Sequence, residues 1–176
     1  MPDFFEDEIP ELPIPAAPRI LTRENLLEMI AEHKTLRAMA LDLSANGIEE
    51  LPSEIGGLGE LIHLNLSGNA LAEVPLEIGQ LKGLRSLSLG SNRLKTLPVE
   101  LGNLTELRYL DLSYNDIVSL PPDLHRLKHL TQLRLENNQV AVGTPVDPAP
   151  PARIRTCRIA ACGSYRGCLA SKRKLG

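Results

Sequence analysis

Residues 84–94 read Leu84-Arg-Ser-Leu87-Ser-Leu89-Gly-Ser-Asn92-Arg-Leu94, and their pattern is the strongest indicator of the fold. The same spacing of leucines around one asparagine returns at residues 61–71 and, with Ile117 in the last position, at residues 107–117. Leucines at alternate positions fit one face of a β-strand, because successive strand side chains point to opposite faces. An amphipathic helix would place its apolar residues three or four positions apart. The stretch therefore predicts a short strand that ends in a turn at the asparagine.

The pattern repeats along the chain with a fixed period of 23 residues. The asparagine column consists of Asn46, Asn69, Asn92, Asn115 and Asn138. The two strand columns hold leucine in every copy: Leu41, Leu64, Leu87, Leu110 and Leu133, then Leu43, Leu66, Leu89, Leu112 and Leu135. One unit cannot bury its leucines alone, so repeated units are expected to stack and share a single aliphatic core. The asparagine amides are expected to satisfy backbone groups where the chain leaves the sheet, which is a structural role.

The second half of each unit also repeats. Its columns are Leu51-Pro52, Val74-Pro75, Leu97-Pro98 and Leu120-Pro121, then Ile55, Ile78, Leu101 and Leu124, then Gly56, Gly79 and Gly102 with the exception His125. Proline fixes φ and lacks an N–H donor, so it suits the return path outside the sheet. A short helical or 3-10 turn is predicted there.

The complete unit, x-L-P-x-x-I-G-x-L-x-x-L-x-x-L-x-L-x-x-N-x-L, resembles the 23-residue, intracellular Ras-type class of leucine-rich repeats. It is also similar to the repeat arms of microbial and Roco-type proteins, over roughly residues 21–142. The resemblance implies an α/β fold: a right-handed solenoid with a five-stranded parallel sheet on its concave face and short helical or 3-10 turns on its convex face. The GTPase loop G-x-x-x-x-G-K-[ST] and the G-x-I-P pattern of extracellular plant receptors do not occur in this sequence.

Four segments are expected. They are an acidic, Pro-rich N-terminal arm (1–20), a helical N-terminal cap (21–35), a repeat domain of five units with the last one truncated (36–143), and a Pro/Ala linker with a basic disordered tail (144–176). The cap is predicted as a helix over 22–33, with Thr22 as N-cap and an apolar stripe of Leu26, Leu27, Ile30 and Ala31.

The composition of the chain indicates its expected cellular location and limits the metal or cofactor sites it could hold. No stretch approaches the roughly 20 apolar residues of a transmembrane helix, and the acidic N-terminus is unlike a secretory signal, so a cytoplasmic protein is expected. Three cysteines, Cys157, Cys162 and Cys168, leave a zinc site and free thiols both open, with free thiols favoured. No cofactor is expected.

Strand alternation predicts which residues face outward on the concave sheet. Among them, tyrosine and arginine are the usual anchors of protein interfaces. The predicted contact patch is Arg85, Arg108, Tyr109, Asp111, Tyr114 and Arg134. The alternative is that these are ordinary solvated residues of a sheet.

We therefore expect a non-enzymatic protein–protein interaction module, a scaffold or regulator in intracellular signalling. Its partner is expected to be a protein, such as a small GTPase or another signalling protein. An enzyme is disfavoured, because no nucleophile–base pair is evident in the sequence. His125 and His129 lie four residues apart, which leaves a helical metal pair as an alternative to solvated side chains.

The C-terminus supports a second hypothesis. Residues 152–176 carry seven basic residues and no acidic one. A cationic segment beside an acidic body could contact nucleic acid or an anionic membrane surface. It could equally fold back on the acidic body. Nucleic-acid binding is disfavoured, because the segment has no RNA-binding motif.

Overall fold

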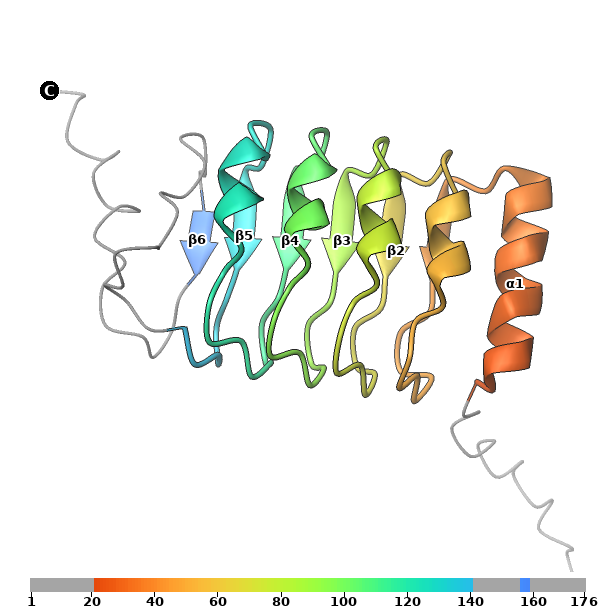
Figure 1. Cartoon of the computed structure of the whole chain (residues 1–176), viewed down its shortest axis with the longest axis horizontal. Helices are drawn as coiled ribbons and strands as arrows, with labels where there is room; N and C mark the ends of the chain where they lie inside the picture. Colours follow the sequence, from red (N-terminus) through yellow and green to blue (C-terminus); the bar gives the residue numbers. More distant parts are fainter. Residues whose placement is uncertain (1–20, 141–155, 159–176) are drawn as a thin grey trace, which may run out of the picture.

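A computed structural model describes residues 21–140 and 156–158 of the 176-residue chain. The chain begins with the α-helix α1 (Arg23–Leu36) and then alternates strands with short 3-10 helices (Figure 1). The strands are β1 (Ala40–Asp42), β2 (His63–Asn65), β3 (Ser86–Ser88), β4 (Tyr109–Asp111), β5 (Gln132–Arg134) and β6 (Thr156–Arg158). The 3-10 helices are η1 (Ser53–Gly57), η2 (Leu76–Gln80), η3 (Val99–Asn103) and η4 (Pro122–Arg126).

The coils stack side by side in chain order. All strand pairs are parallel, and the sheet runs β1-β2-β3-β4-β5-β6. Strand register follows the sequence period, as in the pairing of Leu64 with Leu87 and of Leu87 with Leu110.

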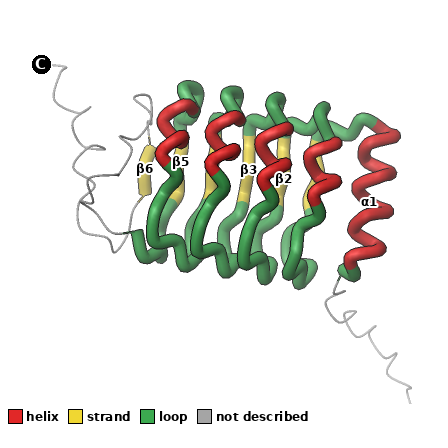
Figure 2. Tube along the Cα trace, viewed as in Figure 1, coloured by secondary structure: helices red, strands yellow, loops and turns green. Residues whose placement is uncertain are grey.

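Strands form one layer and 3-10 helices the other (Figure 2). The predicted solenoid, with its five parallel repeat strands and 3-10 turns, is confirmed. We call the outer surface of the strands the sheet face and the surface formed by η1–η4 the helical face.

The sheet has one strand more than the sequence predicted. β6 pairs with β5 so that Cys157 is opposite Leu133, in the register that the repeat uses. A disordered tail was expected here, and that expectation is wrong at Thr156–Arg158. The remainder of the predicted linker and tail, and the predicted acidic arm, lie outside the described residues.

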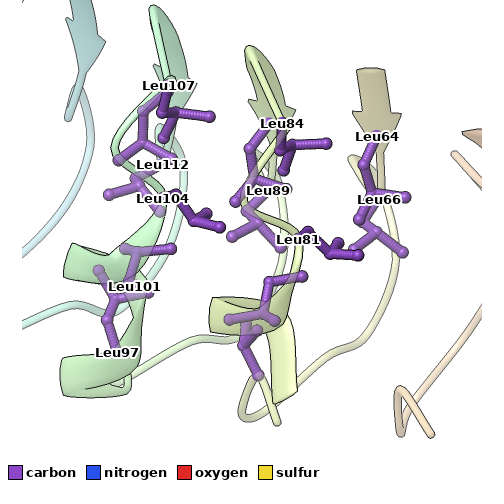
Figure 3. Close-up of a cluster of buried hydrophobic side chains, with 14 of the residues drawn as sticks. Leu64, Leu66, Leu81, Leu84, Leu89, Leu97, Leu101, Leu104, Leu107 and Leu112 are labelled. Carbon is purple, nitrogen blue, oxygen red and sulfur yellow. The ribbon is translucent and has the colours of Figure 1, made fainter. Parts of the chain in front are cut away.

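The core is a continuous column of aliphatic side chains that crosses every coil. All leucines of the two strand columns are buried, and Leu87 and Leu89 keep none of their surface exposed. Leu81 and Leu104, which directly follow the 3-10 helices, belong to the same buried cluster as Leu66 and Leu89 (Figure 3). Each coil therefore buries its apolar residues against the coils on both sides, which explains why the spacing is strict.

The asparagine column joins successive coils through hydrogen bonds. Asn92 Nδ2 donates to the carbonyl oxygens of Leu89 in its own coil and Leu66 in the preceding coil, both at 3.0 Å. Its Oδ1 accepts from the backbone N–H of Leu71 at 3.1 Å. Asn69, Asn115 and Asn138 repeat the bonds to both coils. In the first coil, the side-chain amide of Asn46 donates to Ser44 O, and its backbone N–H donates to Asn69 Oδ1.

The glycine column lets the 3-10 helices pack closely. A Cβ atom added at Gly79 would lie 2.6 Å from the carbonyl oxygen of Glu100 in the next coil. The corresponding distance at Gly102, to Asp123 O, is 2.5 Å. His125 occupies the same column in η4, which is the last 3-10 helix among the described residues, and its side chain is exposed.

The helix α1 packs against the first coil. Thr22 Oγ1 accepts from the Asn25 N–H at 3.3 Å, as predicted for its N-cap. Leu26 and Ile30 are buried in the core, and Met29 packs against it. The predicted stripe is wrong at Ala31, which is exposed because it lies one residue, or about 100° of helical turn, beyond Ile30.

Candidate protein-binding surface

The sheet face near β4 and β5 carries a connected polar network. Tyr109 Oη donates to Asp111 Oδ2 at 3.0 Å, and Arg134 Nη1 lies 3.3 Å from the same oxygen. Arg134 Nε also lies 3.5 Å from Glu136 Oε1. The structure therefore brings three of the six predicted contact residues together, from neighbouring strands, and adds Glu136 to them.

Asp111 is fully engaged inside this network. Its Oδ1 accepts from both the N–H and the Oγ of Ser113, at 2.9 and 2.6 Å. Asn65 makes the same pair of bonds with Ser67 in the second coil, so the bonds belong to the turn that follows the strand. Asp111 is also buried. We conclude that it positions Tyr109 and Arg134 and has little capacity left for a partner.

The pKa values of two groups reflect this arrangement. Burial raises the pKa of Tyr109, with a further contribution from the negative charge of Asp111. The pKa of Arg134 is also raised, chiefly by its hydrogen bond with Tyr109 and then by the charges of Asp111 and Glu136. At neutral pH the network therefore holds a neutral phenol and a cationic guanidinium.

Arg85 and Arg108 occupy equivalent positions in consecutive coils, one residue before β3 and one residue before β4. The Arg108 N–H donates to the Arg85 carbonyl oxygen at 2.9 Å, so the two backbones are adjacent. Both residues are exposed, and neither side chain forms an ion pair within residues 21–140. Two cations thus lie side by side at the start of these strands.

Tyr114 lies at the opposite end of β4, three residues after the strand. Its side chain is 58% exposed. Its φ is +54°, in the left-handed region that favours glycine. The same column holds Ala45, Gly68, Ser91 and Asn137, all with positive φ. Tyr114 is the large side chain of this column, and it does not join the network of Tyr109.

Glu136 was not among the contact residues predicted from the sequence. Its column otherwise holds Ser44, Ser67, Gly90 and Ser113, so a long acidic residue there was a detectable departure from the repeat. Glu136 is 9% exposed, and its Oε2 is buried without a hydrogen-bond partner. The fifth coil has Arg134-Leu-Glu136 where the fourth has Asp-Leu-Ser, and among the described residues the ion pairs of the sheet face form at these two coils.

The described residues contain no group of three His, Cys, Asp or Glu side chains arranged to hold a metal ion. His125 Nδ1 lies 2.6 Å from the Pro122 carbonyl oxygen, at the exposed surface of η4. Cys162 and Cys168 lie outside the described residues, as does the side chain of Cys157.

The sequence profile described as leucine rich repeat matches residues 37–94, 63–117 and 82–140. No curated protein matches the chain significantly. Many solved structures do.

Among the solved structures, a leucine-rich-repeat protein of Leptospira interrogans is 38% identical, with a TM-score of 0.61, over 73% of this chain and 33% of that one. Internalin C2 of Listeria monocytogenes is 26% identical, with a TM-score of 0.62, over 73% and 54%. The leucine-rich-repeat ectodomain of the receptor kinase SOBIR1 from Arabidopsis thaliana is 30% identical, with a TM-score of 0.59, over 69% of each chain. The chain thus spans about a third and about a half of the two bacterial proteins.

Proposed function

Because this chain belongs to the leucine-rich-repeat family, whose domains generally mediate protein–protein interaction, we propose that it binds a protein partner through the sheet face and rim around β4. The observation that carries this proposal is Tyr114. A tyrosine with positive φ is strained by about 1–2 kcal/mol, and its exposed ring gains nothing in the core. Positive φ recurs at this turn in every described coil, and the backbone of Tyr114 is hydrogen-bonded to Asn92 and Glu136. The feature that favours a role at an interface is therefore its large exposed aromatic ring, where the other described coils have Ala45, Gly68, Ser91 and Asn137.

The area of the sheet face sets what else a partner must touch. Six strands at a spacing of about 4.8 Å, with four residues of about 3.3 Å each, present only about 380 Å². A standard interface takes about 800 Å² per partner. We therefore include the rim, with Arg85 and Arg108 at one end of the strands and Tyr114 at the other, in the proposed surface.

The network of Tyr109, Asp111, Arg134 and Glu136 has a positioning role in this proposal. It fixes the ring of Tyr109 and the guanidinium of Arg134 before a partner arrives, which lowers the entropy lost on binding. The module is proposed to be non-enzymatic, a scaffold or regulator in signalling. The resemblance of its repeat to the intracellular Ras-type class supports a cytoplasmic location and a signalling protein, such as a small GTPase, as partner. Within the described residues, no helix is long and apolar enough to cross a membrane.

Affinity capture of a protein partner, with stability measured in parallel, tests the proposal on variants of the proposed surface and on control variants outside it. Tyr114→Gly relieves the backbone strain, so its stability in guanidinium is expected to rise by about 1 kcal/mol, while capture of the partner falls. Arg85→Ala and Arg108→Ala are expected to weaken capture without loss of stability, since both side chains are exposed. Lys82→Ala and Lys128→Ala, exposed cations outside the proposed surface, are the controls. Equal capture by every variant would exclude this surface.

A further inference from the structure

The helical face holds a groove that the proposed function does not use. It lies between the coils of η2 and η3 and has a volume of about 430 Å³. Leu76, Pro75 and Pro98 contribute its apolar lining, and Glu73, Glu77 and Glu100 contribute carboxylates. No basic residue lines it.

Two aliphatic side chains at this groove are exposed and do not contribute to the buried core. Leu76 is 57% exposed, and Val99, which lies between the lining residues Pro98 and Glu100, is 49% exposed. They occupy the same column in adjacent coils, where the flanking coils have Ser53 and Pro122. The leucine columns of the repeat, by contrast, are buried. A neighbouring pair of exposed aliphatics is a feature of contact surfaces.

The carboxylates of the groove are also uncompensated. Glu73, Glu77 and Glu100 form no ion pair within the described part of the chain, whereas Asp123, the counterpart of Glu100 in the next coil, pairs with Arg126 at 3.0 Å. Three nearby negative charges create a local potential that favours a cationic ligand. The groove thus fits a segment that combines basic and apolar side chains.

This chain contains such a segment. Residues 159–176 include Arg166, Lys172, Arg173 and Lys174, have no acidic residue, and carry Ile159, Tyr165, Leu169 and Leu175 among them. We propose that this C-terminal basic segment docks in the groove between η2 and η3 of its own chain. Its charges lie against the three glutamates and its apolar side chains against Leu76 and Val99.

The length of the segment allows this contact. Its 18 residues span up to about 59 Å when extended, at about 3.3 Å per residue. The segment follows β6, which is three strand steps from β3, or about 14 Å along the sheet. Crossing from the strand layer to the helical layer adds about 10 Å, the usual spacing of packed layers. The reach of the extended segment is therefore more than twice this path.

Limited proteolysis of the full chain tests the docking. Trypsin cleaves after Arg166 and Lys172–Lys174, and a docked segment is cut only when it opens, so the initial rate follows the open population. The variant Leu76→Ser/Val99→Ser and the variant Glu77→Gln/Glu100→Gln are expected to raise this rate about five- to tenfold. All four side chains are at least partly exposed, so the fold tolerates the changes. Wild-type chain in 0.5 M NaCl is expected to behave similarly, because salt screens exposed charges.

The controls have the same chemistry outside the groove. Val118 is 48% exposed, so Val118→Ser matches the loss of an exposed aliphatic, and Glu60→Gln matches the loss of an exposed carboxylate. Neither is expected to change the cleavage rate. Equal rates for groove and control variants would overturn the proposal. Protection that increases with protein concentration would also overturn it, since the segment of a second copy would then be the occupant. Rates that fall only when an oligonucleotide is added would assign the segment to nucleic acid instead.

Discussion

At single positions of this chain, contacts with the adjacent coil determine which residue type is tolerated. Asn92 is 8% exposed and its amide joins two coils, so it connects backbone groups that would otherwise be buried without partners. The sequence showed which residue type recurs and at what interval. The carbonyl oxygens that accept from the amide depend on how the coils stack, and the structure identifies them as those of Leu66 and Leu89.

We expect Asn92→Leu to destabilise the fold by about 1–3 kcal/mol, because it leaves buried backbone groups unsatisfied at nearly constant volume. Guanidinium unfolding measures the change. Asn103→Leu is the control, because Asn103 is exposed at the end of η3 and makes no side-chain hydrogen bond within the described residues. If both variants lost the same stability, the amide bonds between coils would not be the cause.

Gly79 supports a second prediction for a single residue. Gly79→Ala places a Cβ 2.6 Å from Glu100 O and forces η2 and η3 apart, which is expected to lower stability by about 1–3 kcal/mol. Gly83→Ala is the matched control, since its Cβ would meet backbone oxygens only at 3.7 Å. Thermal unfolding of the two variants separates a clash between coils from the general effect of replacing glycine.

At the scale of elements, the network across β4 and β5 couples ionisation to stability. Because the pKa of Tyr109 is raised in the folded state, chiefly by burial, the folded chain holds the phenolic proton more tightly than the unfolded chain. This contribution to stability is fully present below the ordinary tyrosine pKa of about 10 and is lost as the pH rises through the folded value.

Denaturation at a series of pH values from 8 to about 12 tests this linkage. Wild type is expected to lose more stability over that range than Tyr109→Phe, which cannot titrate. The difference between the two chains isolates Tyr109 from the lysines and from the other tyrosines. Parallel curves for the two chains would show that ionisation of Tyr109 is not linked to folding.

The elements also show where prediction from sequence stops. The strands at Leu64, Leu87 and Leu110 were predictable, because their leucines repeat without interruption. The network was predicted only as a set of exposed residues, because hydrogen bonds between Tyr109, Asp111 and Arg134 depend on side-chain geometry across two strands.

The strand β6 escaped prediction for a different reason. Residues Ile154-x-x-Cys157-x-Ile159-x-x-Cys162 keep the spacing of L-x-x-L-x-L-x-x-N, but with cysteines at two of its positions. Cys157 follows Leu133 by 24 residues rather than 23, so the fixed period no longer aligns it. A search that allowed cysteine in the asparagine column, and one inserted residue, would have found this copy.

At the scale of the molecule, the contacting elements among the described residues belong to adjacent coils, so stability depends on the interfaces between neighbouring coils. The middle coils are enclosed on both sides, and Asn92 and Asn115 are buried, whereas Asn46 and Asn69 near the first coil are half-buried. Local opening is therefore expected to begin at the ends, and α1 is what encloses the N-terminal end, through Leu26 and Ile30.

This geometry predicts a graded response to loss of the N-terminal cap. Leu26 is 1% exposed, so Leu26→Ala removes buried contacts worth about 2–5 kcal/mol from the interface of α1 with the first coil. In hydrogen exchange, amides that pair β1 with β2 are expected to lose most protection, and those that pair β4 with β5 least. Glu28→Ala, an exposed change on the same helix, is expected to leave the gradient unaltered. A stack in which each coil interacts with its neighbours confines the loss of stability to the end where the substitution is made. A uniform loss of protection across all strands would contradict this model and would mean that the coils unfold as one unit.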